Sequence, residues 1–193
     1  MFEIETSWDI FVQGIGIVAT VFGLLSFQQK TQKRIVFFQL LCNILWTTHF
    51  FLLPNALAGA MLNSIGVFRG IVFYFRSDKK WAQSPIWYGV FSALFIGAAI
   101  FSWLHGDGAW ALLPMTGMLC TTVSLALTDP FRVRVVSFFS SPCWMIYNAF
   151  HGSLPGVLTE TFMICSIIVG VVRIDLPKLR KQKQKSEPNA CER

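Results

Sequence analysis

Seven long apolar stretches separated by short polar turns constrain the fold of this chain more than any motif does. Of its 193 residues, 54% are hydrophobic and only 13% are charged, whereas a soluble domain carries roughly a quarter charged residues. About 20 apolar residues make one helical crossing of a bilayer, about twice what a barrel strand uses. The sequence therefore predicts an all-α, polytopic membrane protein with seven transmembrane helices, near residues 8–27, 35–53, 57–75, 86–104, 109–127, 133–150 and 156–172.

The stretch at 45–63, LWTTHFFLLPNALAGAMLN, recurs in a looser form at 142–160, PCWMIYNAFHGSLPGVLTE. Five pairs of residues share two adjacent offsets, 98 for the first two pairs and 97 for the rest: Arg34 with Arg132, Trp46 with Trp144, Gly59 with Gly156, Asn63 with Glu160, and Arg76 with Arg173. Self-similarity at a fixed period is the mark of a duplicated unit. We therefore predict that one three-helix unit occurs twice.

A single helix between the two units explains why there are seven spans. Three spans bring the chain out on the opposite side, so a linker helix restores the orientation and makes the repeats parallel, with 3+1+3 helices. The predicted divisions are an N-terminal repeat at 1–76, a loop and linker helix at 77–108, and a C-terminal repeat at 109–176. The tail at 177–193 is polar and basic without periodicity, and we expect it to be disordered.

Basic residues alternate between successive turns. The N-terminus and every second turn after it contain no Lys or Arg. The other turns are basic and contain Lys30, Lys33, Arg34, Arg76, Lys79, Lys80, Arg132 and Arg134, and the tail is basic too. Because short cytoplasmic loops carry the excess of Lys and Arg, we expect the N-terminus outside and the C-terminus in the cytoplasm. The net charge of +6 is then a topological signal, and we expect the bilayer, not nucleic acid, as the partner.

At this point the residues resemble a known family. LWTTHFFLL and AGAMLNSI in the first unit, and LLPMTGML and SSPCWMIYNAFHGSLPGVLTETF in the second, are similar to the bacterial inner-membrane YgjV family, and the resemblance covers nearly the whole chain except the tail. It implies an inner-membrane protein of unestablished activity. More distantly, the layout is similar to SWEET and PQ-loop transporters, in which a Trp of the second helix and an Asn of the third face a sugar pocket.

Carried over residue by residue, the SWEET resemblance implies a pocket at Trp46, Asn63, Trp144 and Glu160. The chain departs from that pattern in two ways. An acid stands where the second Asn belongs, and Gln28–Gln29 and Asp129–Pro130 stand where a Pro-Gln pair would be. These departures weaken any claim that sugar is the substrate.

Helix geometry adds two candidates to the pocket. At about 1.5 Å per residue, Asn63 lies roughly 9 Å and Glu160 roughly 6 Å from the outer ends of their helices. His49 and Tyr147, each one turn after its Trp, fall near the same level, as does Asn148. Such a layer suits a hydrophilic pocket open toward the outside. The alternative is that each group hydrogen-bonds a neighbouring helix, which we favour for His49 and Asn148.

Away from the ends of the predicted spans, two charged residues stand within them. Glu160 is the sole acid there, and placing a carboxylate near lipid costs on the order of 3 kcal/mol or more, so we expect it to face the interior, where it can carry a proton or contact a cationic solute. Arg69, about 10 Å from the inner surface, is expected to snorkel toward the cytoplasm. Gly66 and Gly70 form a Gly-x-x-x-Gly face suited to close helix contact, which leaves a homo-oligomer open.

The chain offers little other chemistry. Neither the five cysteines nor the three histidines show a metal-binding spacing, so we expect no metal, no cofactor and no disulfide. A hydrolase using His49 and Glu160 would lack a nucleophile at a diagnostic spacing, and we do not expect an enzyme. Two functions remain. One is a secondary carrier or uniporter for a small polar solute, and the other is a non-transporting membrane partner or sensor; a cavity joining Trp46, Asn63, Trp144 and Glu160 would favour the carrier.

Overall fold

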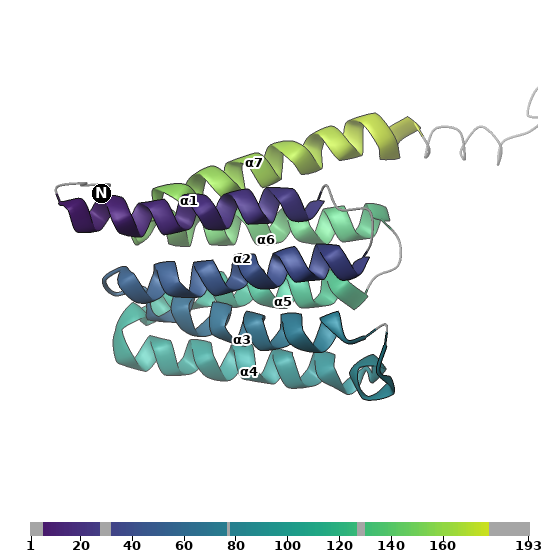
Figure 1. The fold of residues 1–193 in the computed structure, drawn as a ribbon, viewed down its shortest axis with the longest axis horizontal. Coiled ribbons are helices and arrows are strands. Elements are labelled where there is room, and N and C mark those ends of the chain that lie inside the picture. The colour runs from purple at the N-terminus through teal and green to yellow at the C-terminus, as the bar shows by residue number, and fades with distance from the viewer. Residues whose placement is uncertain (1–5, 28–31, 77, 127–129, 178–193) are drawn as a thin grey trace, which may run out of the picture.

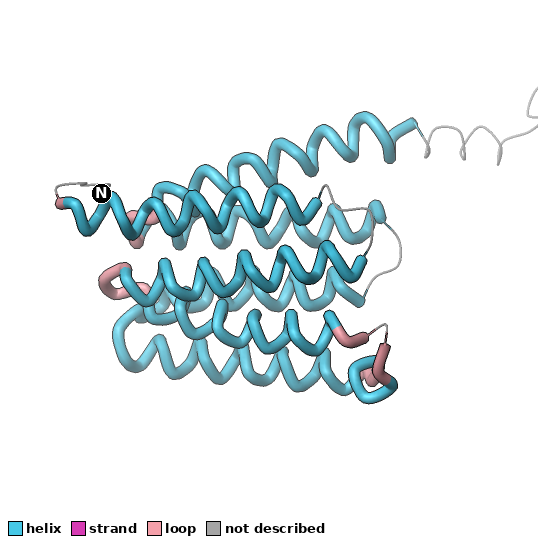
Figure 2. The backbone as a smooth tube through the Cα atoms, viewed as in Figure 1, coloured by secondary structure: helices cyan, strands magenta, loops and turns pink. Residues whose placement is uncertain are grey.

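The computed structural model describes residues 6–27, 32–76, 78–126 and 130–177. In this part of the chain, seven α-helices run back and forth along one common direction and no strand occurs (Figures 1 and 2). They are α1 (Ser7–Phe27), α2 (Gln32–Leu52), α3 (Leu57–Tyr74), α4 (Ile86–Ser102), α5 (Leu112–Ala126), α6 (Pro130–Phe150) and α7 (Leu154–Gly170). Most of the basic tail lies outside the described residues, so its predicted disorder stays a prediction.

Local sequence explains where the first and last of these helices begin. At the start of α1, Thr6 and Asp9 form a reciprocal capping pair: the Asp9 N–H donates to Thr6 Oγ1 at 3.3 Å, and the Thr6 N–H donates to Asp9 Oδ2 at 3.0 Å. Ser153 caps α7 by accepting a hydrogen bond from Gly156 N at 3.3 Å, and Pro155 occupies the first turn, where its missing N–H costs nothing.

The short connection between α4 and α5 is a tight reversal, as its glycines indicate. A π-helical turn, η2 (Trp103–Asp107), leads directly into a 3-10 turn, η3 (Gly108–Ala111). Gly108 has a φ of 55°, a left-handed conformation that glycine adopts without a steric cost. The reversal places α4 and α5 side by side.

Six of the helices form a closed ring of neighbours. α1 packs on α2 and α2 on α3, while α5 packs on α6 and α6 on α7. Contacts between α3 and α5 and between α1 and α7 join the two groups, and α4 packs against α3 and α5 from outside the ring. We call the end of the ring where α1 ends and α2 begins the basic end, and the end where α2 ends and α3 begins the opposite end (Figure 1).

The outer surface of the bundle is strongly apolar. Leu104 is 74% exposed and Ile86 66%, and many other large apolar side chains also face outward, more than soluble monomers expose. Among the described residues, four helical stretches are long and apolar enough to cross a membrane: Ser7–Leu25, Leu57–Tyr74, Ile86–Ser124 and Leu154–Arg173. The third contains both α4 and α5. The chain is therefore an all-α integral membrane protein.

Small residues let the helices approach most closely at the opposite end. A Cβ added to Gly59 would lie 2.8 Å from the Phe50 ring, and one added to Gly156 would collide with Asn148. Gly16 is similarly pressed against the ring of Pro155. Such contacts are the usual way in which membrane helices pack without a hydrophobic driving force, and they leave little space at this end.

The Gly-x-x-x-Gly face of α3 is used inside the chain. A Cβ at Gly70 would lie 3.2 Å from Leu40 on α2, and one at Gly66 would lie 3.6 Å from Met118 on α5. The pattern is thus explained by packing within one molecule and does not require a second copy.

Candidate functional site: a polar cavity inside the helix ring

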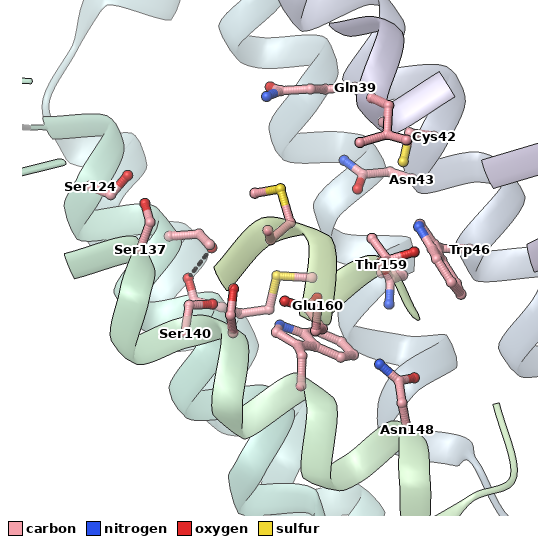
Figure 3. A pocket seen from close by; sticks show the side chains of 18 of the residues that line it. Gln39, Cys42, Asn43, Trp46, Ser124, Ser137, Ser140, Asn148, Thr159 and Glu160 are labelled. Carbon is pink, nitrogen blue, oxygen red and sulfur yellow. Dashed lines mark hydrogen bonds between the residues drawn. The ribbon is translucent and has the colours of Figure 1, made fainter. Parts of the chain in front are cut away.

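A cavity of about 400 Å³ lies inside the ring, within the usual range for small-molecule sites. Side chains from α1, α2, α3, α5, α6 and α7 line it, and Figure 3 shows them converging from several helices. The lining consists of Gly23, Leu24, Gln39, Cys42, Asn43, Trp46, Phe50, Asn63, Arg69, Met118, Thr121, Ser124, Ser137, Ser140, Ser141, Trp144, Asn148, Thr159, Glu160 and Met163.

The structure brings together the four residues implied by the SWEET resemblance. Trp46, Asn63, Trp144 and Glu160 all line the cavity. Phe50 joins the two tryptophans, with ring centroids 5.7 Å from Trp46 and 6.0 Å from Trp144. These three aromatic side chains form one wall of the cavity, and such rings favour flat or apolar parts of a ligand.

Three amide side chains supply much of the cavity's hydrogen-bonding capacity. Asn43 Nδ2 donates to Gly66 O at 3.3 Å, and Asn63 Nδ2 donates to Gly59 O at 2.9 Å. Asn148 is buried, and its Oδ1 has no hydrogen-bond partner among the described residues. Buried polar atoms are nearly always paired, so this unpaired acceptor in a cavity wall is a candidate contact for a bound solute (Figure 3).

Glu160 faces the interior, as the cost of a carboxylate in lipid requires. Its carboxyl group is hydrogen-bonded to the side chain of Ser141 on α6. Glu160 forms no ion pair among the described residues. Figure 3 places it between Asn148 and Trp46 on one side and Ser140 on the other.

Arg69 does not snorkel toward the basic end, so the sequence-based expectation is wrong. It is 9% exposed and lines the cavity. Its Nη1 donates to Thr122 Oγ1 at 2.8 Å and to Thr121 Oγ1 at 3.2 Å, and its guanidinium carbon lies 5.3 Å from the centre of the Phe95 ring. These neighbours on α5 and α4 replace the polar groups that Arg69 would meet at the membrane–water interface. The threonine hydroxyls accept its hydrogen bonds, and the Phe95 ring attracts its positive charge.

The cavity is closed at the opposite end. Phe50 and Asn148, the lining residues nearest that end, are almost fully buried, and glycine contacts pack the helices tightly around them. Toward the basic end the lining continues to Leu24 and Ser124, close to the ends of α1 and α5. Of these two, Leu24 is 40% exposed, so the lining reaches the surface of the bundle toward the basic end.

The structure places His49 and Tyr147 outside the cavity lining. His49 is fully buried, with Nδ1 2.9 Å from Val12 O and Nε2 2.8 Å from Ser153 Oγ. It thus links α2 to α1 and to the start of α7. Tyr147 is also fully buried, and its hydroxyl accepts a hydrogen bond from Gly59 N at 2.9 Å. Both side chains hold helices together, the alternative favoured above for His49.

Asp107 is a buried acid that the sequence reading passed over. The Tyr147 hydroxyl donates to its Oδ2 at 2.8 Å. Leu57 N donates to Oδ1 at 3.1 Å and Ala58 N to Oδ2 at 2.7 Å. Ala56, at the cap position of α3, has no side chain that can cap, so Asp107 caps this helix from the α4–α5 reversal. The absence of a capping residue at the start of α3 is the sequence signal that could have indicated a capping acid elsewhere in the chain.

Apolar helices that enclose a cavity lined by both polar and apolar side chains define an integral membrane protein with an internal site of solute size. The chain belongs to the Imp-YgjV family of bacterial inner membrane proteins, which it matches over residues 10–178. It is similar to inner membrane protein YgjV of Escherichia coli (strain K12), with 26% identity over 183 residues, covering 94% of this chain and 91% of that protein. No solved structure matches it.

Proposed function

We propose that this protein is a secondary carrier or uniporter that moves a small polar solute across the inner membrane by alternating access. The observation that carries this proposal is the cavity of about 400 Å³ inside the ring, whose lining is buried at the opposite end and reaches the surface toward the basic end. A membrane protein that only binds a partner has no need of such a cavity, because packed helices are more stable than hollow ones.

The lining of the cavity supports the proposed 3+1+3 duplication. Adding 98 to each lining position on α2 gives a lining position on α6: Gln39 with Ser137, Cys42 with Ser140, Asn43 with Ser141, Trp46 with Trp144, and Phe50 with Asn148. Adding 97 takes Asn63 on α3 to Glu160 on α7. Exchanging the two triplets also maps the α1–α7 contact onto the α5–α3 contact. A site between two such repeats is the arrangement found in transporters built from parallel repeats.

We further propose that the N-terminus lies outside the cytoplasm and the C-terminus inside, from the positive-inside rule. The described arginines Arg34, Arg76 and Arg132 mark the basic end as cytoplasmic, so the present conformation is open inward. A reporter fused after Arg193 should be active only as a cytoplasmic fusion. Activity of a periplasm-dependent reporter at that position would overturn the orientation.

Alternating access can be tested without knowing the substrate. In a variant lacking the native cysteines, Ser137→Cys and Asn148→Cys are reacted with a membrane-impermeant maleimide from either side of sealed vesicles. Both positions line the cavity. We expect Ser137→Cys to react mainly from the cytoplasmic side, and Asn148→Cys to react from both sides as the protein changes conformation.

Ile146→Cys is the matched control, since Ile146 lies on the same helix and is 48% exposed on the apolar surface. It should react poorly from both sides. If Asn148→Cys reacts from neither side, or only from one side under all conditions, alternating access fails. A non-transporting partner or sensor that retains the fold would then be the better interpretation.

A further inference from the structure

We propose that the solute is zwitterionic, with an anionic group held by Arg69 and a cationic group held by Glu160. This inference rests on the proposed function and names the class of its substrate. Arg69 and Glu160 are the two charged residues in the lining of the cavity, and each lacks an opposite charge among the described residues.

Arg69 is surrounded by neutral groups. Its hydrogen-bond partners are Thr121 Oγ1, Thr122 Oγ1 and, at 3.7 Å, Met118 Sδ. A buried guanidinium without a carboxylate is costly, and its planar fork is suited to binding a carboxylate through two parallel hydrogen bonds. Ser124, one turn further along α5 toward the basic end, adds a hydroxyl to the same part of the cavity.

The path toward Arg69 is also positive. A smaller hollow of about 70 Å³ adjoins the cavity on the side of the basic end and shares Gln39, Asn43 and Arg69 with it. Arg76 lines this hollow, and no acidic residue does. Arg76 Nη1 donates to the Tyr88 hydroxyl at 2.7 Å, a neutral partner, so two arginines and no carboxylate line this hollow, which favours the entry of an anionic group.

Glu160 is placed to receive the other charge. On the proposed duplication it lies at the level of Asn63, and Arg69 is six residues further along α3, which is roughly 9 Å along the helix axis. The two charged groups are therefore too far apart along the bundle for a direct pair, yet they face one cavity. A small molecule that carries both charges would give Arg69 an anionic partner and Glu160 a cationic one. Ser141 and Asn148 would be neutral hydrogen-bonding groups beside its ammonium.

The test uses the full-length protein, purified in detergent, and measures its melting temperature and ligand affinity. The probes are the standard amino acids, 4-aminobutyrate and glycine betaine. For the best of these, the same carbon skeleton without the amine and without the carboxylate is added, such as butyrate and butylamine for 4-aminobutyrate. A ligand that binds only the folded state raises the melting temperature, and the rise grows with the ratio of ligand concentration to Kd. We expect at least one zwitterion to raise it, and the two singly charged analogues to bind at least tenfold more weakly.

Variants separate the two contacts. Glu160→Gln should abolish discrimination against the anionic analogue, whereas Arg69→Lys, which keeps the charge but loses the fork, should weaken the zwitterion about tenfold to a hundredfold. The controls are Arg173→Gln and Asp78→Asn, because both residues are exposed and lie outside the cavity. Both controls should bind like the wild type. The Lys variant is chosen because a shorter neutral side chain would leave an empty space and deprive Thr121 and Thr122 of their donor, which threatens folding.

The proposal is overturned if no zwitterion shifts the melting temperature, or if binding is unchanged in both Glu160→Gln and Arg69→Lys. A neutral solute such as a sugar that binds in a Trp46- and Asn63-dependent way would refute the zwitterion while leaving the carrier in place. The accessibility of Ser137→Cys and Asn148→Cys is independent of any ligand, so a failure there refutes the carrier itself.

Discussion

Replacing Asp107 by Ala should destabilise the protein far more than its position in a five-residue turn indicates. The carboxylate accepts hydrogen bonds from Leu57 N, Ala58 N and the Tyr147 hydroxyl. The side chain is 4% exposed, so water replaces these bonds poorly. One substitution therefore removes the cap of α3 and a bond that joins α6 to the reversal between α4 and α5.

The size of the effect follows from the contacts. Loss of a capping side chain costs about 0.5–2 kcal/mol, and a hydrogen bond to a charged group contributes about 1.5–3 kcal/mol. We expect Asp107→Ala to lower the free energy of unfolding by about 3 kcal/mol. Tyr147→Phe removes the donor to Asp107 and the acceptor of Gly59 N, and it should cost about 2 kcal/mol.

Reversible unfolding by SDS in mixed micelles, followed by tryptophan fluorescence, measures both values. The double variant supplies the coupling energy, which should be about 1–2 kcal/mol because the two side chains share one hydrogen bond. His105→Gln is the matched control, since His105 lies in the same turn, is exposed and bonds only within its own helical segment. If Asp107→Ala costs less than about 0.5 kcal/mol, or if the two effects simply add, the hydrogen bonds do not hold this end together.

Three further substitutions test the packing around the cavity. In Gly117→Ala the new Cβ would lie 2.5 Å from the Trp144 ring, so the ring must move; we expect a loss of about 1–3 kcal/mol and a shifted tryptophan emission. Asn148→Leu removes a buried amide whose Oδ1 has no hydrogen-bond partner among the described residues. The free energy of unfolding should therefore stay level or rise, while ligand-induced thermal shifts disappear. His49→Ala removes two buried hydrogen bonds, one of them to Ser153, and should lower the free energy of unfolding by about 2–4 kcal/mol; a near-neutral result would refute the linking role.

The helical membrane class was readable from the sequence because lipid allows few solutions. A backbone in hydrocarbon must satisfy its own hydrogen bonds, so long apolar stretches become helices whatever their detailed sequence. The placement of Trp46, Asn63, Trp144 and Glu160 around one cavity was also reached, in this case from a resemblance. Polar side chains on different helices meet when the bilayer excludes them from the outer surface.

Features that depend on contacts between different helices could not be predicted from the sequence. Arg69 stands near enough to the basic end for snorkelling, and only the positions of Thr122 and Phe95 on other helices show that it has polar and aromatic partners inside. Asp107 reads as a turn residue until α3 is seen to begin beside it. Which end of the cavity is closed likewise follows from glycine contacts across helices, such as that of Gly59 with Phe50, and no local pattern specifies those.

The closed end of the cavity is held by two polar links that the proposed duplication relates to each other. His49 and Tyr147 lie 98 residues apart, and each reaches from the second helix of its own triplet to the start of the third helix of the other. His49 bonds Ser153, which caps α7, and Tyr147 bonds Gly59 N and Asp107, which caps α3.

If the protein works by the proposed alternating access, both links would break when this end opens, because each joins a helix of one proposed triplet to a helix of the other. Each is a hydrogen bond that water can replace once it is exposed, so its net contribution is modest, about 0.5–1.5 kcal/mol for a neutral pair and more for the charged one. Contacts of this strength stabilise the conformation that is closed at this end, but they are weak enough to break and re-form. The aromatic contacts of Phe50 with Trp46 and Trp144 lie directly beneath these links, so separating the triplets at the closed end would expose the same cavity to the other side of the membrane.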